Sequence, residues 1–555
     1  MAQLLDQTAD LILYNGRAIT MDAAQPRASA IAIRDGRFLG VGDEADLRPL
    51  AGRRTELIDL GGRAVIPGLN DTHNHMSTTG LGMLHVSLEG AISIADVAGR
   101  IAERARATPR GEWVVTAQVG EPAISHALAE RRYPTRADLD AVAPDHPVCI
   151  QAPHVLIVNS AALQRVGVDR NTPDPDGGRL GRDAAGELDG LFFEPPAMTH
   201  VRRHLPPVTH ADRVEGLRLA GQAYNRVGLT SVCEHGASLE AVAAYQELWA
   251  RGELTVRGYV HLALDPTFSL AEMDDYLAHL AFTAGPGFGD DRLRVAGLKV
   301  FVDGGVGIGT ALMREPYRTA SGELSHGLQL ISREKLLGIL RLANKYGLRV
   351  AQHDSGGAAI DLVLDCYEEV NRERPIGDRR FVLVHCQFPS EANMAAIKRL
   401  GAVVVTQTVF LYSMGIGYLK YLGPAVASQA IPLRRWLDAG VPVALGSDAP
   451  VNPYPPLLGL WHAATRQDRQ SGEVIGADQR ITVAEALRGY TVAGAYVTFD
   501  EGKKGSISPG QLADLVVLDD DPLACPLEQV KELSVEMTIV GGRVVHAAPG
   551  LGGRR

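Results

Sequence analysis

The sequence predicts an α/β protein, a TIM-type (β/α)8 barrel with a composite β-sandwich domain built from both ends of the chain. The middle of the chain alternates apolar strands with amphipathic helical segments, which is typical of a parallel sheet with crossover helices. Both ends are instead rich in short strands and Gly-containing turns. The length of 555 residues suits more than one folded unit, since single cores rarely grow beyond about 250 to 300 residues.

The β-sandwich is predicted from two strand-rich segments. In residues 10–67, short β-rich runs alternate with the pairs NG, DG and GG, which are hairpin turn signals. Residues 511–547 have the same character in "QLADLVVLDDD" and "SVEMTIVGGRVVHA". Because short sheets with open edges gain stability by pairing, we expect the two ends to join in one domain composed of residues 1–64 and 481–555.

The barrel is expected over residues 65–480. Its eight strands, in chain order, are "AVIPGLND", "LTSVCEHG", "VRGYVHLAL", "VAGLKVFVDGG", "LRVAQHD", "FVLVHCQ", "AVVVTQT" and "VPVALGSDAP". Helical segments such as "SREKLLGILRLANKYG" separate the later strands and end in Gly, a common helix stop. Roughly residues 80–210 interrupt the first and second strands. An insertion of this length is expected to lie over the C-terminal mouth of the barrel, where substrate-shaping elements belong.

Composition and charge narrow the class of protein. The formal net charge of -10 is modest and no Lys/Arg-rich cluster is present, which argues against nucleic acid or an anionic membrane as a partner. The five cysteines are scattered and include no C-x-x-C pair, so we expect neither a disulfide framework nor a cysteine zinc site. The first residues lack the pattern of a signal peptide, and no apolar run reaches the roughly 18 residues of a membrane span. We therefore expect a cytoplasmic protein.

Residues typical of metal ligands fall at the ends of the predicted strands. In "GLNDTHNHM", His73 and His75 are two positions apart, so both imidazoles would leave an extended strand on one face. His353 and His385 end the fifth and sixth strands, and Asp448 ends the eighth. The C-terminal ends of barrel strands converge on one mouth, so these side chains are expected to meet. Imidazole and carboxylate are the usual ligands of hydrolytic zinc, which predicts one or two Zn2+ ions, with other divalent metals compatible.

Each of these residues also has a structural interpretation when it is taken alone. His353 or His385 could be a hydrogen-bonded core histidine, and Asp448 in "GSDAP" could cap a turn. Their joint placement favours the metal site. Lys299, within the fourth strand, is the exception, because an ammonium beside a cation is repelled. It either pairs with Asp303 or, once deprotonated, adds carbon dioxide and becomes a carbamate that can bridge two metals.

Several longer segments, spread over nearly the whole chain, match a known pattern: "AVIPGLNDTHNH", "PHVLIVNSAAL", "TPDPDGGRLGRDAAGELDG", "GLKVFVDGG", "LVHCQF", "GSDAPV", "PYPPLLGLWHAATR", "ITVAEALRGYT" and "GSISPGQLADLVVLDDDP". On these segments the chain resembles the amidohydrolase superfamily, and within it the family 3 branch that includes N-substituted formamide deformylases. The metal ligands that this resemblance implies are His73, His75, a carboxylated and bridging Lys299, His353, His385 and Asp448. It also implies that Asp448 accepts the proton of the metal-bound water.

Two departures from the family pattern concern the pocket. The segment after His353 reads "DSGG", so Gly357 stands where an Asp is usual. After the seventh strand, "TQT" replaces a more common Gln-Pro. Because of both departures, the substrate of the family is a weaker guide to the substrate of this chain. The predicted metal ligands are unchanged.

The predicted activity is hydrolysis of an amide, formamide or related non-peptide C–N bond of a small-molecule substrate by metal-activated water. Asp448 would accept the proton of the water and return it to the leaving nitrogen. His154, on the insertion, and His235, after the second strand, are candidates for holding the carbonyl oxygen. Two alternatives stay open: a deaminase with one metal and an unmodified lysine, and a non-catalytic barrel scaffold, against which the full ligand set argues. We expect a homodimer.

Overall fold

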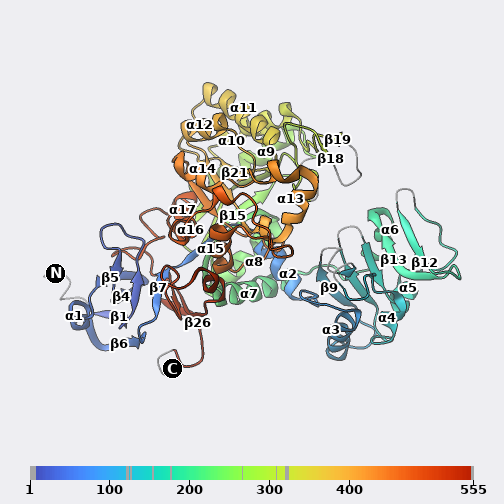
Figure 1. Cartoon of the computed structure of the whole chain (residues 1–555), viewed down its shortest axis with the longest axis horizontal. Helices are drawn as coiled ribbons and strands as arrows, with labels where there is room; N and C mark the ends of the chain where they lie inside the picture. The colour runs from blue at the N-terminus through green and yellow to red at the C-terminus, as the bar shows by residue number, and fades with distance from the viewer. Residues whose placement is uncertain are drawn as a thin grey trace. The chain divides into compact units, whose positions relative to one another are not determined.

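The computed structural model describes residues 8–119, 124–125, 128–152, 155–175, 178–265, 267–307, 309–318 and 324–551. The chain divides into two compact units (Figure 1). One unit is formed by Met1–Met76 together with Gly221–Arg555, and the other by Ser77–Ala220.

The first unit is built around eight parallel strands that pair in chain order. These are β8 (Leu69–Asn74), β14 (Leu229–Ala237), β15 (Arg257–Ala263), β17 (Leu293–Phe301), β20 (Val350–Asp354), β21 (Val382–His385), β22 (Val403–Thr406) and β23 (Val443–Leu445). A short antiparallel strand, β16 (Phe288–Gly289), also pairs with β17. The Thr72 hydroxyl of β8 donates to the carbonyl oxygen of Leu445 in β23 at 2.8 Å. The sheet is therefore nearly closed, and the predicted TIM-like barrel is confirmed.

Helices follow most of the barrel strands. They are α7 (His210–Arg226), α8 (Leu239–Ala250), α9 (Leu270–His279), α10 (Arg333–Lys345), α11 (Gly357–Glu373), α12 (Glu391–Leu400), α13 (Val409–Ala427), α14 (Leu433–Asp438), α15 (Pro456–Thr465), α16 (Val483–Tyr490) and α17 (Val492–Val497). Consecutive helices from α9 to α12 pack against one another (Figure 1). Local sequence sets their ends: α12 begins with a capping box at Ser390 and stops at Gly401, which adopts the left-handed conformation.

The predicted first strand, "AVIPGLND", is divided at Gly68. The residues before Gly68 form β7 (Ala64–Pro67), which pairs with a strand from the other end of the chain. Strand β8 begins only after Gly68. A Cβ atom at Gly68 would lie 2.3 Å from the Thr230 hydroxyl oxygen, so this close approach requires glycine. The residues on both sides are apolar and buried, which is why the hydrophobic pattern does not show the division.

In the first unit the terminal segments form two further sheets, one made of N-terminal strands alone and one made of strands from both ends of the chain. One has the order β5 (Arg37–Gly42), β4 (Ala30–Arg34), β1 (Ala9–Tyr14) and β6 (Ala51–Asp59). The other has the order β26 (Arg543–Ala547), β25 (Val535–Val540), β24 (Leu515–Leu518), β7, β2 (Arg17–Ile19) and β3 (Arg27–Ala28). In the second sheet β24 pairs with β7, with Val517 opposite Val65. One buried cluster takes side chains from both sheets, among them Leu13, Ile33, Val65, Leu515 and Ile539.

A buried ion pair links a barrel strand to the start of β24. The guanidinium of Arg257, in β15, donates two hydrogen bonds to the carboxylate of Asp514, at 2.7 and 2.8 Å. Burial alone would raise the pKa of Asp514, but the charge and hydrogen bonds of Arg257 hold it below its usual value. Bidentate pairs of this kind are among the stronger polar contacts in proteins.

The second unit has its own sheet and core. The strands lie in the order β12 (Arg179–Arg182), β13 (Leu188–Phe193), β11 (Val155–Val158), β10 (Val148–Gln151) and β9 (Val114–Gln118). The helices α3 (Ile94–Ala107), α4 (Arg136–Asp140), α5 (Ser160–Val166) and α6 (Glu194–Arg202) accompany them. Asn159 caps α5 through Ala162 N and also accepts from Val148 N. Throughout the described part of the chain, no helix combines the length and apolar character of a membrane span.

Candidate metal centre

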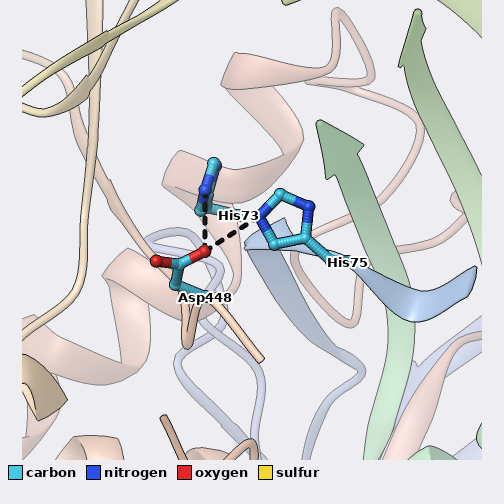
Figure 2. Close-up of side chains that lie close together, drawn as sticks. All are labelled: His73, His75 and Asp448. Atoms are coloured by element: carbon cyan, nitrogen blue, oxygen red, sulfur yellow. Dashed lines mark ion pairs between the residues drawn. The ribbon is translucent and has the colours of Figure 1, made fainter. Parts of the chain in front are cut away.

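Three side chains meet where the first and last barrel strands end. His73 lies in β8, His75 follows directly after it, and Asp448 lies in the loop after β23. The Nε2 atoms of His73 and His75 each lie 3.0 Å from Asp448 Oδ1 (Figure 2). One ligand atom from each residue lies within 4.8 Å of the others, a spacing that can hold a metal ion.

Hydrogen bonds across the seam of the barrel fix the loop that carries Asp448. The backbone N–H of Asp448 donates to the His73 carbonyl at 2.7 Å, and that of His75 donates to the Ala449 carbonyl at 2.9 Å. Asp448 adopts a left-handed conformation with φ of 64°. Such a conformation is unfavourable for a non-glycine residue and persists where the surroundings over-determine it. The carboxylate is therefore held in place by the backbone on both sides of the seam.

Asp71 supports the same loop and was not singled out by the sequence reasoning. Its carboxylate accepts from the backbone N–H of Ser447 at 2.9 Å, from the Ser447 hydroxyl, and from the Asn74 side chain at 2.8 Å. The backbone N–H of His73 also donates to it, at 3.3 Å. Burial raises the pKa of Asp71 to about 6. A carboxylate within a strand that is expected to be buried, two residues before a histidine, is the sequence signal that could have identified it.

His353 and His385 lie beside this group, at the ends of β20 and β21. Their ring centroids are 4.5 Å apart, and the His385 ring is 5.0 Å from that of His73. His385 Nδ1 lies 2.7 Å from Gln407 Oε1. Because an amide oxygen only accepts, Nδ1 carries the proton and Nε2 keeps its lone pair. Gln407, the glutamine of the unusual "TQT" segment, thus orients a candidate ligand.

Lys299 projects from β17 and is buried. Among the described residues its Nζ atom has no hydrogen-bond partner. Burial lowers the pKa of Lys299 to about 7. The alternative that Lys299 pairs with Asp303 is wrong: the Asp303 carboxylate instead accepts from the backbone N–H groups of Leu312, Ser355 and Gly356.

The donor set fits a cation. Asp448 Oδ1 faces two imidazole nitrogens, yet within the described ranges no hydrogen bond of acceptable geometry reaches this buried oxygen. Burial lowers the pKa of His73 and His353 well below the usual value and that of His385 to about 4. Burial would raise the pKa of Asp448, but His73 and His75 hold it well below its usual range. Neutral imidazoles beside a carboxylate are the forms in which these side chains bind metal.

A cavity of about 270 Å³ opens over the group. The six predicted ligands all line it: His73, His75, Lys299, His353, His385 and Asp448. Its remaining walls are largely apolar, with Phe301, Val306, Phe410, Met414 and Val451. Ser355, Gln387 and Tyr418 add polar groups. Among the described residues that line it, Lys299 is the single Lys or Arg.

The Gly357 departure has a structural counterpart. A Cβ atom at this position would lie 2.4 Å from Arg314 Nη1. The guanidinium of Arg314 is held by Asp361 at 2.7 Å and by the Phe388 carbonyl at 3.0 Å. Arg314 thus takes the space that the Asp side chain usual at this position would need.

Of the two histidines predicted to hold the carbonyl oxygen, the structure describes only His235. His154 lies outside the described residues. His235, in β14, is buried and is not among the cavity-lining residues. Its Nδ1 atom lies 2.6 Å from His73 Nδ1, so His235 faces a candidate ligand. Its role in holding a carbonyl oxygen stays a prediction.

Comparison with known proteins agrees with this geometry. The sequence pattern of the amidohydrolase family matches residues 56–546. The chain belongs to the amidohydrolase family. The putative amidohydrolase YtcJ of Bacillus subtilis is 30% identical to it, over 96% of this chain and 99% of the relative. The N-substituted formamide deformylase of Arthrobacter pascens is 29% identical, over 97% of this chain and 98% of the relative.

Solved structures extend the comparison. An uncharacterized metal-dependent hydrolase from Pyrococcus furiosus superposes with a TM-score of 0.72 at 26% identity, covering 92% of this amidohydrolase and 99% of that chain. Its counterpart from Pyrococcus horikoshii gives 0.73 at 24% identity, covering 93% and 99%, and shows the fold alone. The amidohydrolase is thus a metal-dependent hydrolase that acts on carbon–nitrogen bonds other than peptide bonds, in a small-molecule substrate.

Proposed function

We propose that this amidohydrolase cleaves an amide, formamide or closely related C–N bond, using zinc held as one or two ions. The ligands would be His73, His75, Lys299, His353, His385 and Asp448. The observation that carries this proposal is the convergence of two imidazole nitrogens on Asp448 Oδ1, each at 3.0 Å. When bound, a divalent metal lowers the pKa of water toward neutrality and polarises a carbonyl oxygen.

Asp448 has the central chemical role among the protein's own groups. Its low pKa keeps the carboxylate ionised at neutral pH, so it can accept a proton from the attacking water. The carboxylic acid formed in this way then returns the proton to the nitrogen that leaves. The backbone hydrogen bonds to His73 and Ala449 hold the carboxylate at the cavity wall throughout these steps.

Lys299 would bridge two ions as a carbamate. With a pKa of about 7, a large fraction of its amine is neutral at neutral pH. The nitrogen lone pair forms a bond to the carbon of carbon dioxide, and one N–H proton is released. The carbamate oxygens would then be able to hold a metal, which an ammonium would repel. A bridging lysine would favour amide hydrolysis over deamination. An adenine deaminase relative aligns with only 13% of this chain.

The cavity supports a neutral and apolar substrate. Phe301, Phe410, Met414 and Val451 surround the space next to the ligands. The deformylase relative acts, by its name, on N-substituted formamides. We therefore place amides and formamides with an apolar substituent first among the candidate substrates.

The finer organisation is also part of the proposal. Residues 1–64 and 481–555 would form one β-sandwich domain, which the buried cluster shared by the two terminal sheets supports. Residues 65–480 would form the barrel, with the insertion at about 80–210. We further propose a homodimer in the cytoplasm.

The test is hydrolysis of a panel of N-formyl and N-acyl amines by the zinc-loaded protein, with metal content measured in parallel. We expect amine release that a chelator abolishes and added zinc restores. Two ions per chain would support the bridged site, and one ion with release of ammonia from an aminated ring would support the deaminase. A protein that binds no divalent metal would refute the proposal.

A further inference from the structure

We propose that His235 is a positioning residue, which fixes by one hydrogen bond the ring nitrogen that His73 presents to the metal. This inference rests on the proposed role of His73 as a metal ligand. It gives His235 a role in metal binding, through His73, in place of direct contact with the substrate.

The bond is defined by the distance between two ring nitrogens. His73 Nδ1 and His235 Nδ1 are 2.6 Å apart, and the two rings meet edge to face at 69°. At this separation one nitrogen must donate a proton and the other must accept it. His73 Nε2 faces Asp448 Oδ1 and would need its lone pair for the metal. The proton therefore lies on His73 Nδ1, and His235 Nδ1 accepts it.

The strand pairing places His235 at this position. β14 pairs with β8, with Glu234 opposite Asn74. Successive side chains of a strand point to opposite faces. Glu234 points away and accepts a hydrogen bond from the Tyr245 hydroxyl, so the next residue, His235, points toward the His73 side. The acceptor is thus set by the register of the sheet.

The surroundings of His235 argue against a purely structural role. Accepting at Nδ1 puts its own proton on Nε2, and this buried atom has no hydrogen-bond partner among the described residues. The neighbouring ring is His261, at 4.5 Å and 87°, and neither of its nitrogens has such a partner there. A buried N–H without an acceptor lowers stability, and an apolar ring would avoid this penalty. Orientation of His73 explains why an imidazole occupies the site.

Two amide variants separate the hydrogen bond from the packing. In His235→Asn the side-chain oxygen can occupy the place of Nδ1, so an acceptor for His73 remains. In His235→Gln the oxygen reaches toward the place of Nε2, and that acceptor is lost. The matched control is His261→Phe, which changes the neighbouring buried ring and leaves the His73 bond intact.

The measurement is zinc affinity by competition with a chelator, with thermal unfolding of each metal-free protein as a check on folding. Loss of a group that orients a ligand typically weakens metal binding by about 10- to 100-fold. We expect this loss in His235→Gln, a change of less than about threefold in His235→Asn, and wild-type affinity in His261→Phe. Equal affinities of the Asn and Gln variants would overturn the inference.

A second measurement needs no variant. In zinc-loaded wild-type protein labelled with 15N-histidine, a proton shared by the Nδ1 atoms of two imidazoles should give a nitrogen–nitrogen coupling across the hydrogen bond. Its absence would overturn the inference even if a variant fails to fold. Failure of the wild-type protein to bind zinc would instead remove the proposed function, so the two outcomes are distinct.

Discussion

The backbone N–H of Asp448 donates to the carbonyl oxygen of His73 at 2.7 Å. The first and last strands of the barrel are therefore joined at two of the candidate ligands. Backbone hydrogen bonds across the seam therefore hold the main chains of these ligands close together. Precise placement of this kind is what a metal site requires from its scaffold.

Asp448→Asn should separate metal binding from turnover. The amide keeps one oxygen that can act as a ligand but cannot accept a proton from water. We expect zinc content near that of the wild type and a kcat lower by about 10²- to 10⁴-fold, the usual contribution of general acid–base catalysis. Asp438→Asn, whose side chain is 64% exposed, is the control. A kcat close to wild type in Asp448→Asn would contradict the assigned role.

Asp71→Asn should loosen the loop that carries Asp448. The amide nitrogen would face the Asn74 side chain, so two donors would meet where an acceptor is now present. Loss of such a buried hydrogen bond lowers the free energy of unfolding by about 1 to 3 kcal/mol. We expect this loss in chemical denaturation, together with weaker zinc retention. A variant with unchanged zinc affinity would show that Asp71 does not support the site.

Lys299 should make activity depend on carbon dioxide. Protein stripped of metal and dialysed in buffer free of carbon dioxide should regain full activity with zinc only when bicarbonate is also added. Lys299→Ala should lose activity, and a small carboxylic acid such as acetate should restore part of it by supplying the missing oxygens. Full recovery of the stripped wild-type protein with zinc alone would exclude the carbamate.

The charge of the cavity should govern substrate choice. Lys299 is the single Lys or Arg among its described lining residues, and a carbamate would remove that positive charge. We expect kcat/KM at least about tenfold lower for an amide with a carboxylate on its substituent than for the neutral isostere, because burying an unpaired charge is unfavourable. Met414→Lys should narrow this difference, and Met414→Leu should leave it unchanged.

Asp514→Ala should destabilise the whole first unit. It leaves the buried Arg257 guanidinium unpaired, which typically lowers the free energy of unfolding by about 3 to 5 kcal/mol. The exposed pair of Arg17 and Asp520 gives the control, since Asp520→Ala should change it by no more than about 1 kcal/mol. Equal effects of the two variants would contradict the role of the buried pair.

The same ion pair predicts the direction of a pH effect. The pKa of Asp514 is below its usual value in the folded protein. Its contribution to stability is therefore fully present above about pH 4 and is lost as the pH falls through the lower folded pKa. Urea denaturation between pH 2 and pH 7 should show the stability difference between wild type and Asp514→Asn shrinking on acidification. A difference that is constant across this range would contradict the assignment.

The sequence was sufficient for the barrel and for the six candidate ligands that line its cavity. Strand order follows from the alternation of apolar runs and helices, and a barrel brings the C-terminal ends of its strands together whatever their separation in sequence. His73 and His385 could therefore be placed together in advance. The division at Gly68 could not be predicted, because buried apolar residues continue through it.

Residues that act through a neighbour were the least predictable. Gln407 and Asp71 contact candidate ligands through hydrogen bonds that depend on strand register and loop conformation, which a hydrophobic pattern does not encode. His235 was recognised as a candidate functional residue, but its contact with His73 was not predicted. That contact depends on where the Nδ1 atom of His235 lies, which the sequence does not encode.

The pairing of β7 with β24 constrains the order in which the protein can mature during synthesis. Residues 64–67 leave the ribosome long before residues 515–518, so their sheet edge has no partner while nearly the whole barrel is being made. That sheet can be completed only after residues 515–518 have emerged. Chaperones that shield exposed strand edges should therefore influence the yield of active enzyme more than its final stability.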